Sequence, residues 1–204
     1  RPSLATIATD GERVVVDALP NFLGQHQLPW PWPGGVYLLG RSMGGLVACH
    51  SAALKGRLFE GVILESTFCG SYAPGALPPE EPPKEGALGT VEPRFWSAEL
   101  QEAVERATQL CRKLVKPGME ELALEGSPDF VYLMASEDKL RAFSGRLLIL
   151  HGEIDTIVPV SHARRLCDAA TFATRRLVTV NKGHNDISNS AKYVAALKKF
   201  LDGG

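Results

Sequence analysis

A serine flanked by glycines directly follows an apolar run in this chain. The run covers residues 36–39, and the next six residues read Gly-Arg-Ser-Met-Gly-Gly, with the serine at position 42. Between a strand and a helix, Gly-x-Ser-x-Gly is typical of a sharp turn that exposes a nucleophilic hydroxyl. Gly40 and Gly44 are expected there because the two backbones approach too closely for side chains. We predict that Ser42 is a nucleophile and that the amide of Met43 donates to an oxyanion.

A serine nucleophile needs a base, and the base needs a group that fixes its tautomer. Asp155 follows the apolar run 147–150, and His184 follows the run 177–180. The carboxyl ends of successive parallel strands meet at one sheet edge, so these side chains are expected to converge with Ser42 in the order Ser, Asp, His. We predict a triad in which His184 is the general base and Asp155 orients it.

Each of these residues also has a simpler interpretation. Ser42 would be an ordinary serine in a glycine-rich helix start, Asp155 a helix cap before Pro159, and His184 a solvated loop histidine. Glu65 ends another apolar run and is the alternative acid, although a surface or loop-capping charge suits it better. The agreement of all three positions in order and placement favours the triad.

Other chemistry is less well supported. The remaining histidines lack metal-ligand spacing, so we expect no metal and no cofactor; they are His26, His50, His151 and His162. His50 and Cys69 are expected to be packed inside. A nucleotide-binding α/β domain is the alternative because the glycines near Ser42 also follow a strand, but Gly-x-Gly-x-x-Gly is not met.

The surrounding pattern alternates strands and helices. Apolar runs at 36–39, 61–64, 147–150 and 177–180 predict about four strands buried on both faces, as in a parallel sheet. Helices are expected at 4–22, 46–54, 159–170 and 187–201, with Asn185 and Asp186 capping the last. The fold class is therefore α/β, with helices flanking a parallel sheet.

Residues 69–144 interrupt this alternation. They begin with a Pro/Gly/Glu-rich stretch, continue with a helical pattern from Ser97 to Leu114, and end before the strand pattern resumes at Arg146. We interpret residues 69–144 as a lid-like insertion within a single domain that covers residues 1–204.

Length and composition fit one ordinary domain. The chain has 204 residues, 45% hydrophobic and 22% charged, with a net charge of -1 and no long basic run, so a nucleic-acid partner is not expected. No apolar run reaches the 18 or so residues of a membrane span. Four scattered cysteines suit reduced thiols in a cytoplasmic setting. The oligomeric state stays open.

These motifs resemble those of the α/β-hydrolase superfamily. The resemblance rests on Gly-Arg-Ser-Met-Gly-Gly at 40–45, Glu-Ser-Thr-Phe at 65–68, His-Gly-Glu-Ile-Asp-Thr-Ile-Val-Pro at 151–159 and Gly-His-Asn-Asp at 183–186. It is strongest with the α/β-hydrolase-domain group that includes protein depalmitoylases and with serine-aminopeptidase-like hydrolases. The resemblance implies hydrolysis of an ester, thioester or amide of a small-molecule or acyl substrate.

The resemblance also implies missing parts. That fold has about eight strands, the serine follows the fifth, and a second oxyanion donor lies on a loop after the third. We therefore expect this chain to be the carboxyl-terminal part of a hydrolase without its first strands and oxyanion loop. The alternative function is a catalytically impaired fragment or a non-catalytic binding protein of the same fold.

Overall fold

The computed structural model describes residues 10–30, 32–33, 35–70 and 135–204. Its strands are β1 (Tyr37–Arg41), β2 (Gly61–Glu65), β3 (Arg146–Gly152) and β4 (Thr174–Val180). Its helices are η1 (Val14–Ala18), α2 (Leu19–Gln25), α3 (Met43–Lys55), η2 (Gly56–Leu58), α6 (Ser136–Arg141), α7 (Ser161–Ala169), η4 (Ile187–Asn189) and α8 (Ala191–Leu201).

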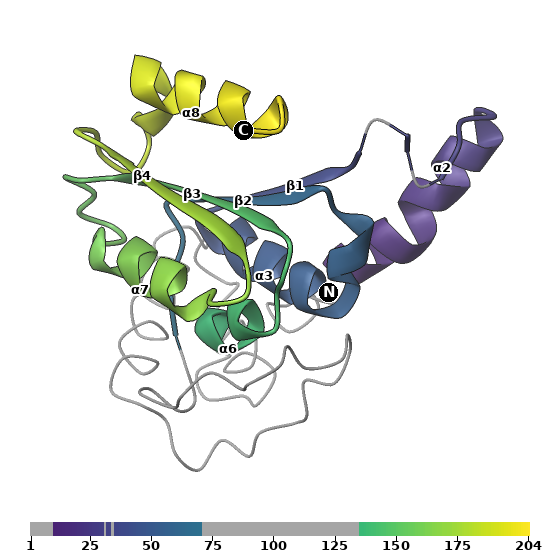
Figure 1. Cartoon of the computed structure of the whole chain (residues 1–204), viewed down its shortest axis with the longest axis horizontal. Coiled ribbons are helices and arrows are strands. Elements are labelled where there is room, and N and C mark those ends of the chain that lie inside the picture. The colour runs from purple at the N-terminus through teal and green to yellow at the C-terminus, as the bar shows by residue number, and fades with distance from the viewer. Residues whose placement is uncertain (1–9, 31, 34, 71–134) are drawn as a thin grey trace, which may run out of the picture.

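The four strands form one sheet in the order β1-β2-β3-β4, and every neighbouring pair is parallel. Arg41 pairs with Glu65, Glu65 with Leu150, and Gly152 with Val180. The carboxyl ends of all strands therefore meet at one edge of the sheet, as Figure 1 shows. This confirms the α/β class with a parallel sheet and flanking helices.

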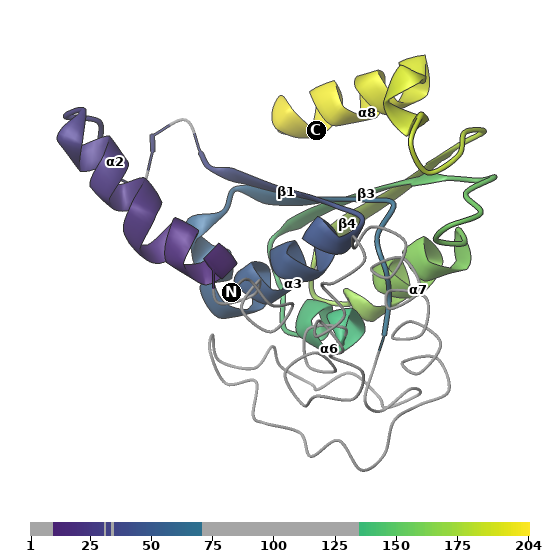
Figure 2. The same cartoon turned by 180° about the vertical axis from the view of Figure 1, so that it is seen from behind.

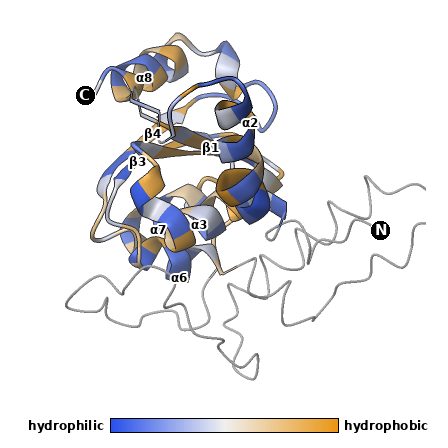
Figure 3. Ribbon diagram, turned by 90° about the vertical axis from the view of Figure 1, so that its right-hand side faces the viewer, coloured by the Kyte–Doolittle hydropathy of each residue, from blue (hydrophilic) through white to orange (hydrophobic). Residues whose placement is uncertain are grey.

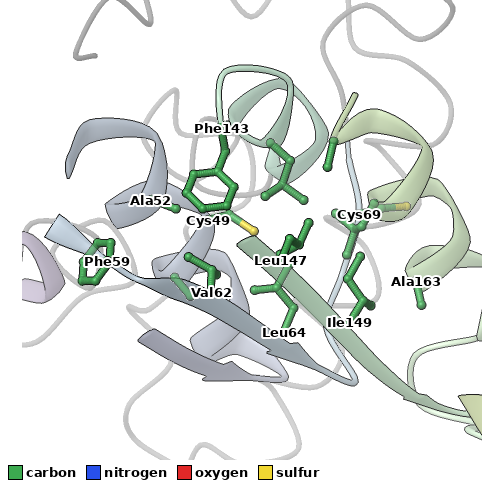
Figure 4. Packing of buried hydrophobic residues seen from close by; sticks show 14 of the residues in the cluster. Cys49, Ala52, Phe59, Val62, Leu64, Cys69, Phe143, Leu147, Ile149 and Ala163 are labelled. Atoms are coloured by element: carbon green, nitrogen blue, oxygen red, sulfur yellow. The ribbon is translucent and has the colours of Figure 1, made fainter. Parts of the chain in front are cut away.

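Helices cover both faces of the sheet, with α3, α6 and α7 on one face and α8 on the other (Figures 1 and 2). Because strand side chains alternate between faces, neighbouring residues of the apolar runs enter different cores. The larger core contains Val62, Leu64, Leu147 and Ile149, seen in Figure 4 beneath α3 and α6, and the core under α8 contains Ile63, Leu148 and Leu150. Uninterrupted apolar runs are thus explained by burial on both sides.

The helices themselves carry both hydrophobic and hydrophilic residues (Figure 3). In α8, Tyr193, Ala196 and Phe200 are buried against the sheet, at the three- and four-residue spacing of one helix face. In contrast, α3 buries most of its length between the sheet and its neighbours, and its mainly small side chains make this possible. That close packing places the start of α3 against the ends of β1 and β2.

Several predicted boundaries differ from the structure. The expected helix 187–201 is divided into η4 and α8, because Ser190 is extended with φ -91° and ψ 128°. The helix expected at 4–22 appears as η1 and α2, and its residues before Asp10 lie outside the described residues. Most of the predicted insertion, including the helix from Ser97 to Leu114, also lies outside them.

The described end of the predicted insertion contains α6, which packs against α3 and α7. Among the helices that the structure describes, none is long and apolar enough to cross a membrane.

Candidate active site

Ser42 lies in a strained turn between β1 and α3. Its φ of 50° and ψ of -121° lie in a region that residues with side chains rarely adopt. Three hydrogen bonds fix the turn: Ser42 N donates to Glu65 O at 2.8 Å, and Ser42 O accepts from Thr67 Oγ1 at 2.5 Å and from Gly45 N at 3.0 Å. The surrounding structure therefore holds the serine in the geometry expected of a nucleophile elbow.

The glycines around Ser42 are required for reasons that differ in part from the prediction. A Cβ on Gly40 would lie 2.5 Å from Gly44 O and 2.6 Å from the Cβ of Ala48, so the expected close approach is present there. A Cβ on Gly44 would have no described atom within 4 Å apart from its chain neighbours and its own helix backbone, so the expectation of a collision was wrong there. The second crowded position is Gly45, where a Cβ would lie 2.2 Å from Thr67 Oγ1.

Asp155 lies in the turn that follows β3, and its two carboxylate oxygens have different partners. Oδ1 accepts the backbone N–H groups of Ile157 at 2.9 Å and Val158 at 2.8 Å, while Oδ2 lies 2.7 Å from His184 Nδ1. Burial by itself would raise the pKa of Asp155, but these hydrogen bonds outweigh it and hold that pKa below its ordinary value. Asp155 is therefore a charged acceptor in a buried position.

His184 connects this carboxylate to the serine. Its side chain is largely buried, and its Nε2 lies 3.1 Å from Ser42 Oγ while Nδ1 faces Asp155. An Nδ1–H that donates to Asp155 leaves Nε2 free to accept the hydroxyl proton of Ser42. The structure thus brings together the three side chains from three different strand ends.

The loops that carry Asp155 and His184 touch through their backbones. Glu153 N donates to Val180 O at 2.8 Å, and Ile154 N donates to Lys182 O at 3.2 Å. At Gly152, a Cβ would lie 2.2 Å from Lys182 O and 2.8 Å from Gly183 O, so only glycine fits without displacing the neighbouring loop. This contact fixes the acid and the base relative to each other.

Glu65, the alternative acid, has other partners in the structure. Its carboxylate is buried, pairs with Arg41 Nε at 3.0 Å and accepts a hydrogen bond from Tyr193 Oη at 2.8 Å. The carboxylate in contact with His184 is that of Asp155. Sequence reasoning did not find Arg41, which also donates to His184 O, because the direction of its side chain depends on the pairing register of β1 with β2.

Two further expectations about this region are corrected. Asp186 occupies the N-cap position of η4 but makes no capping hydrogen bond there, because its Oδ1 accepts from Gly183 N. Asn185 Oδ1 accepts from Arg41, and the N-cap position of α8 belongs to Ser190. Both residues instead shape the loop around His184.

The remaining predicted residues are placed as follows. Met43 is the first residue of α3, directly after Ser42, and its role as an oxyanion donor stays a prediction. His151 is buried beside the acid: its Nε2 donates to Val158 O at 2.8 Å and lies 3.5 Å from Asp155 Oδ2. Burial lowers the pKa of His151, which therefore favours the neutral form. His50 and Cys69 are both buried.

The parallel sheet and the serine turn between β1 and α3 define an α/β hydrolase in fold. The model of the serine aminopeptidase S33 family matches residues 8–189, and the chain belongs to that family. The family and the fold were both predicted from the sequence motifs, and both are confirmed. Together they support a hydrolase.

Curated relatives match a shorter part of the chain. The alpha/beta hydrolase domain-containing protein 17C of Xenopus tropicalis is 33% identical over 66 residues, which cover 32% of this chain and 21% of the relative. The protein of the same name from Homo sapiens is 32% identical over 66 residues. The matched segment thus spans about a fifth of these relatives.

Solved structures share the fold across almost the whole chain. The acylaminoacyl peptidase of Pyrococcus horikoshii has a TM-score of 0.60 at 11% identity, covering 98% of this chain and 28% of that one. The esterase RhEst1 from Rhodococcus sp. ECU1013 has a TM-score of 0.50 at 19% identity, covering 97% and 73%. At such identities the likeness shows the fold alone.

Proposed function

We propose that this chain is a serine hydrolase that transfers an acyl group to water through Ser42, His184 and Asp155. The observation that carries the proposal is the continuous contact from Ser42 Oγ to His184 Nε2 at 3.1 Å and from His184 Nδ1 to Asp155 at 2.7 Å. This is hydrogen-bond reach for a nucleophile, its base and the group that orients the base.

The proposed reaction has two halves. Ser42 Oγ bonds to the carbonyl carbon while His184 Nε2 takes the hydroxyl proton, and the same proton is then given to the leaving group as its bond breaks. In the second half His184 takes a proton from a water whose oxygen bonds to the acyl carbon, and it gives that proton to Ser42 Oγ as the acyl–Oγ bond breaks, which releases the acid and restores Ser42. Asp155 stays ionised and stabilises the imidazolium in both halves.

The negative oxygen of each tetrahedral intermediate needs a donor. We assign this role to the backbone N–H of Met43, which follows the nucleophile at the start of α3. The positive end of a helix dipole and an amide fixed in place both favour a developing oxyanion.

The substrate class is an ester, thioester or amide with a small-molecule or acyl component. Two features support this breadth: the family is named for a serine aminopeptidase, and the structures of similar fold include an esterase and an acylaminoacyl peptidase. The triad attacks any of these carbonyls, and the choice between them depends on contacts with the rest of the substrate.

A fluorophosphonate probe tests the proposal directly, because it bonds covalently to an activated serine. We expect the 204-residue chain to be labelled at Ser42, as identified by mass spectrometry of the modified peptide, and Ser42→Ala to remain unlabelled. Ser161→Ala, at an exposed position that begins α7, is the matched control and should be labelled like the wild type. Equal labelling of wild type and Ser42→Ala, or labelling of neither, would reject the proposal.

A further inference from the structure

A group of interactions outside the triad reaches the backbone of its histidine. Arg41 Nη2 lies 3.1 Å from His184 O and 3.1 Å from Asn185 Oδ1, and Arg41 Nε lies 3.0 Å from Glu65 Oε1. Tyr193 Oη donates to the other oxygen of Glu65 at 2.8 Å. One guanidinium therefore links the end of β1 to the end of β2 and to the loop that carries His184.

The position of Arg41 follows from the strand register. Arg41 pairs with Glu65 across β1 and β2, so both side chains point to the same face of the sheet. That face is covered by α8, which supplies Tyr193, and the loop from β4 to α8 passes the same edge. The residue before the nucleophile is thus directed toward the loop of the base.

Glu65 keeps the guanidinium in place. The carboxyl side chain is 6% exposed, and a buried carboxylate is stable only when charged or hydrogen-bonding partners replace the lost water. Arg41 supplies the charge. Burial, followed by the contact with Glu65, raises the pKa of Tyr193 to about 12, so its hydroxyl stays protonated and donates at any pH at which the protein is handled.

We infer that Arg41 is a positioning residue for His184, held in place by Glu65 and Tyr193, an inference that rests on the proposed function of the triad. Asp155 fixes the imidazole ring through Nδ1, and Arg41 fixes the backbone of the same residue through its carbonyl. Both constraints are needed to hold Nε2 within reach of Ser42, because a displacement of about 1 Å can cost roughly 100-fold in rate.

The shape of the guanidinium suits this task better than a simple positive charge. Arginine presents several N–H donors in a fixed plane, so Nε can bind Glu65 while Nη2 binds the loop. Lysine has one ammonium on a flexible stem and cannot keep both contacts in the same geometry. The side chain of Arg41 is 44% exposed, so its role lies in geometry more than in stability.

The test uses Arg41→Ala and Arg41→Lys, with Arg176→Ala as the matched control. Arg176 is an exposed arginine of β4, and its removal changes the net charge equally. Arg41→Lys keeps a charge beside Glu65, which preserves the fold if Arg41→Ala is unstable. Circular dichroism and thermal unfolding establish that each variant is folded.

Two measurements report on the site. The first is the proton resonance of His184 Nδ1, expected far downfield because of the short contact with Asp155, and assigned by its loss in His184→Gln; this signal does not depend on activity. The second is the rate of fluorophosphonate labelling of Ser42. We expect both Arg41 variants to lose or broaden the resonance and to be labelled about 10- to 100-fold more slowly. Millimolar methylguanidinium should restore part of the rate to Arg41→Ala and none to Arg41→Lys.

The outcomes separate the two proposals. If folded Arg41 variants keep the wild-type resonance, the positioning role is overturned whether or not the wild type is labelled. If the resonance is lost in these variants but unchanged in Arg176→Ala, the positioning role stands when labelling is also slowed; it stands too when the wild type is itself unlabelled, a result that rejects only the hydrolase proposal. Where the wild type is labelled, a rate within twofold of it in both variants overturns the inference, even if the resonance is lost.

Discussion

The orientation of the Asp155 carboxylate is set by the main chain. Because Oδ1 accepts two backbone N–H groups, from Ile157 and Val158, Oδ2 is left to face His184. That arrangement fixes the imidazole as the tautomer with its proton on Nδ1, which is the form able to accept a proton at Nε2. The tautomer of His184 is therefore determined by two backbone N–H groups, five and six residues after the end of β3.

Asp155→Asn should abolish most activity while keeping the fold. The two backbone donors will hold the amide oxygen, so the amide NH2 will face His184 and donate to Nδ1, which places the proton on the wrong nitrogen. We expect kcat for an activated ester to fall by about four orders of magnitude. Steady-state kinetics on folded protein measures this change.

The matched control for this substitution is Glu153→Gln. It removes a carboxylate from the same loop, but the side chain of Glu153 accepts a hydrogen bond from Thr179 Oγ1 on β4 and not from a triad residue. Its kcat should stay within a few-fold of wild type. A loss of less than tenfold in Asp155→Asn would contradict the proposed tautomer control.

The convergence of the three proposed triad residues could be predicted because each follows an apolar run by three to five residues. Parallel strands deliver their carboxyl ends to one edge, so Ser42, Asp155 and His184 had to lie near one another once the runs were interpreted as strands. Nothing comparable marks Arg41, whose contacts with Glu65 and His184 depend on the strand register. The register became visible only in the structure.

At the scale of elements, the contact between β1 and α3 determines the serine turn. Helix α3 begins one residue after Ser42 and passes so close to β1 that Gly40 lies against Gly44 O and the Cβ of Ala48. Backbone atoms on both sides leave no flexible side chain to move away. The turn is therefore held by packing of two elements against each other.

Gly40→Ala and Gly44→Ala should have opposite effects on the free energy of unfolding. The added methyl at Gly40 overlaps backbone and forces β1 and α3 apart, so we expect a loss of about 3 kcal/mol. An added methyl at Gly44 meets no described atom within 4 Å outside its own helix and chain neighbours. Alanine in place of glycine in a helix should therefore raise the free energy of unfolding by about 0.5–1 kcal/mol. Urea unfolding of both variants gives the comparison, and an equal loss in both would contradict the packing argument.

Strands and helices were predicted where the sequence has extended hydrophobic patterns. Their boundaries were missed where the backbone angles of a single residue end or divide an element. The run 147–150 indicated the centre of β3, but the strand extends from Arg146 to Gly152 because its neighbours offer pairing partners. The break at Ser190 interrupts an apolar periodicity that continues on both sides of it. A pattern of hydrophobic residues does not report such a local change in backbone angle.

For the whole molecule, three ionisable groups are buried on the α3 side of the sheet, and burial favours the uncharged form of each: His50, Lys139 and Cys49. Burial, and to a smaller extent the charge of Lys139, lowers the pKa of His50 to about 4. Burial likewise lowers the pKa of Lys139 to about 7, while burial raises that of the Cys49 thiol to about 12. Unfolding exposes these groups to water, where their pKa values return to the ordinary ones.

Stability should therefore fall as the pH falls from about 6.5 toward 4. In this window unfolded His50 binds a proton and folded His50 does not, so proton binding lowers the free energy of the unfolded state relative to the native state. The contribution of His50 to the free energy of unfolding is fully present above pH 6.5. About 2 kcal/mol of it is lost by pH 4.5. Urea unfolding at pH 7, 6, 5 and 4.5 measures the slope.

His50→Gln tests the origin of that slope, because glutamine cannot bind the proton. Its free energy of unfolding should depend less on pH across the same window than that of the wild type, whatever its value at pH 7. Parallel curves for the two proteins would assign the acid sensitivity to other groups.

The backbone contact at Gly152 affects how the three proposed catalytic residues can move relative to one another. The loops of Asp155 and His184 are joined by backbone hydrogen bonds, whereas Ser42 follows β1, on the other side of β2 in the sheet. Two side-chain contacts connect the end of β1 with the loop of His184: the hydroxyl of Ser42 with the imidazole, and the guanidinium of Arg41 with His184 O. In the proposed reaction, a displacement of Ser42 relative to this pair would lengthen the hydroxyl–imidazole contact and stop turnover, while the hydrogen bond between His184 and Asp155 stayed in place.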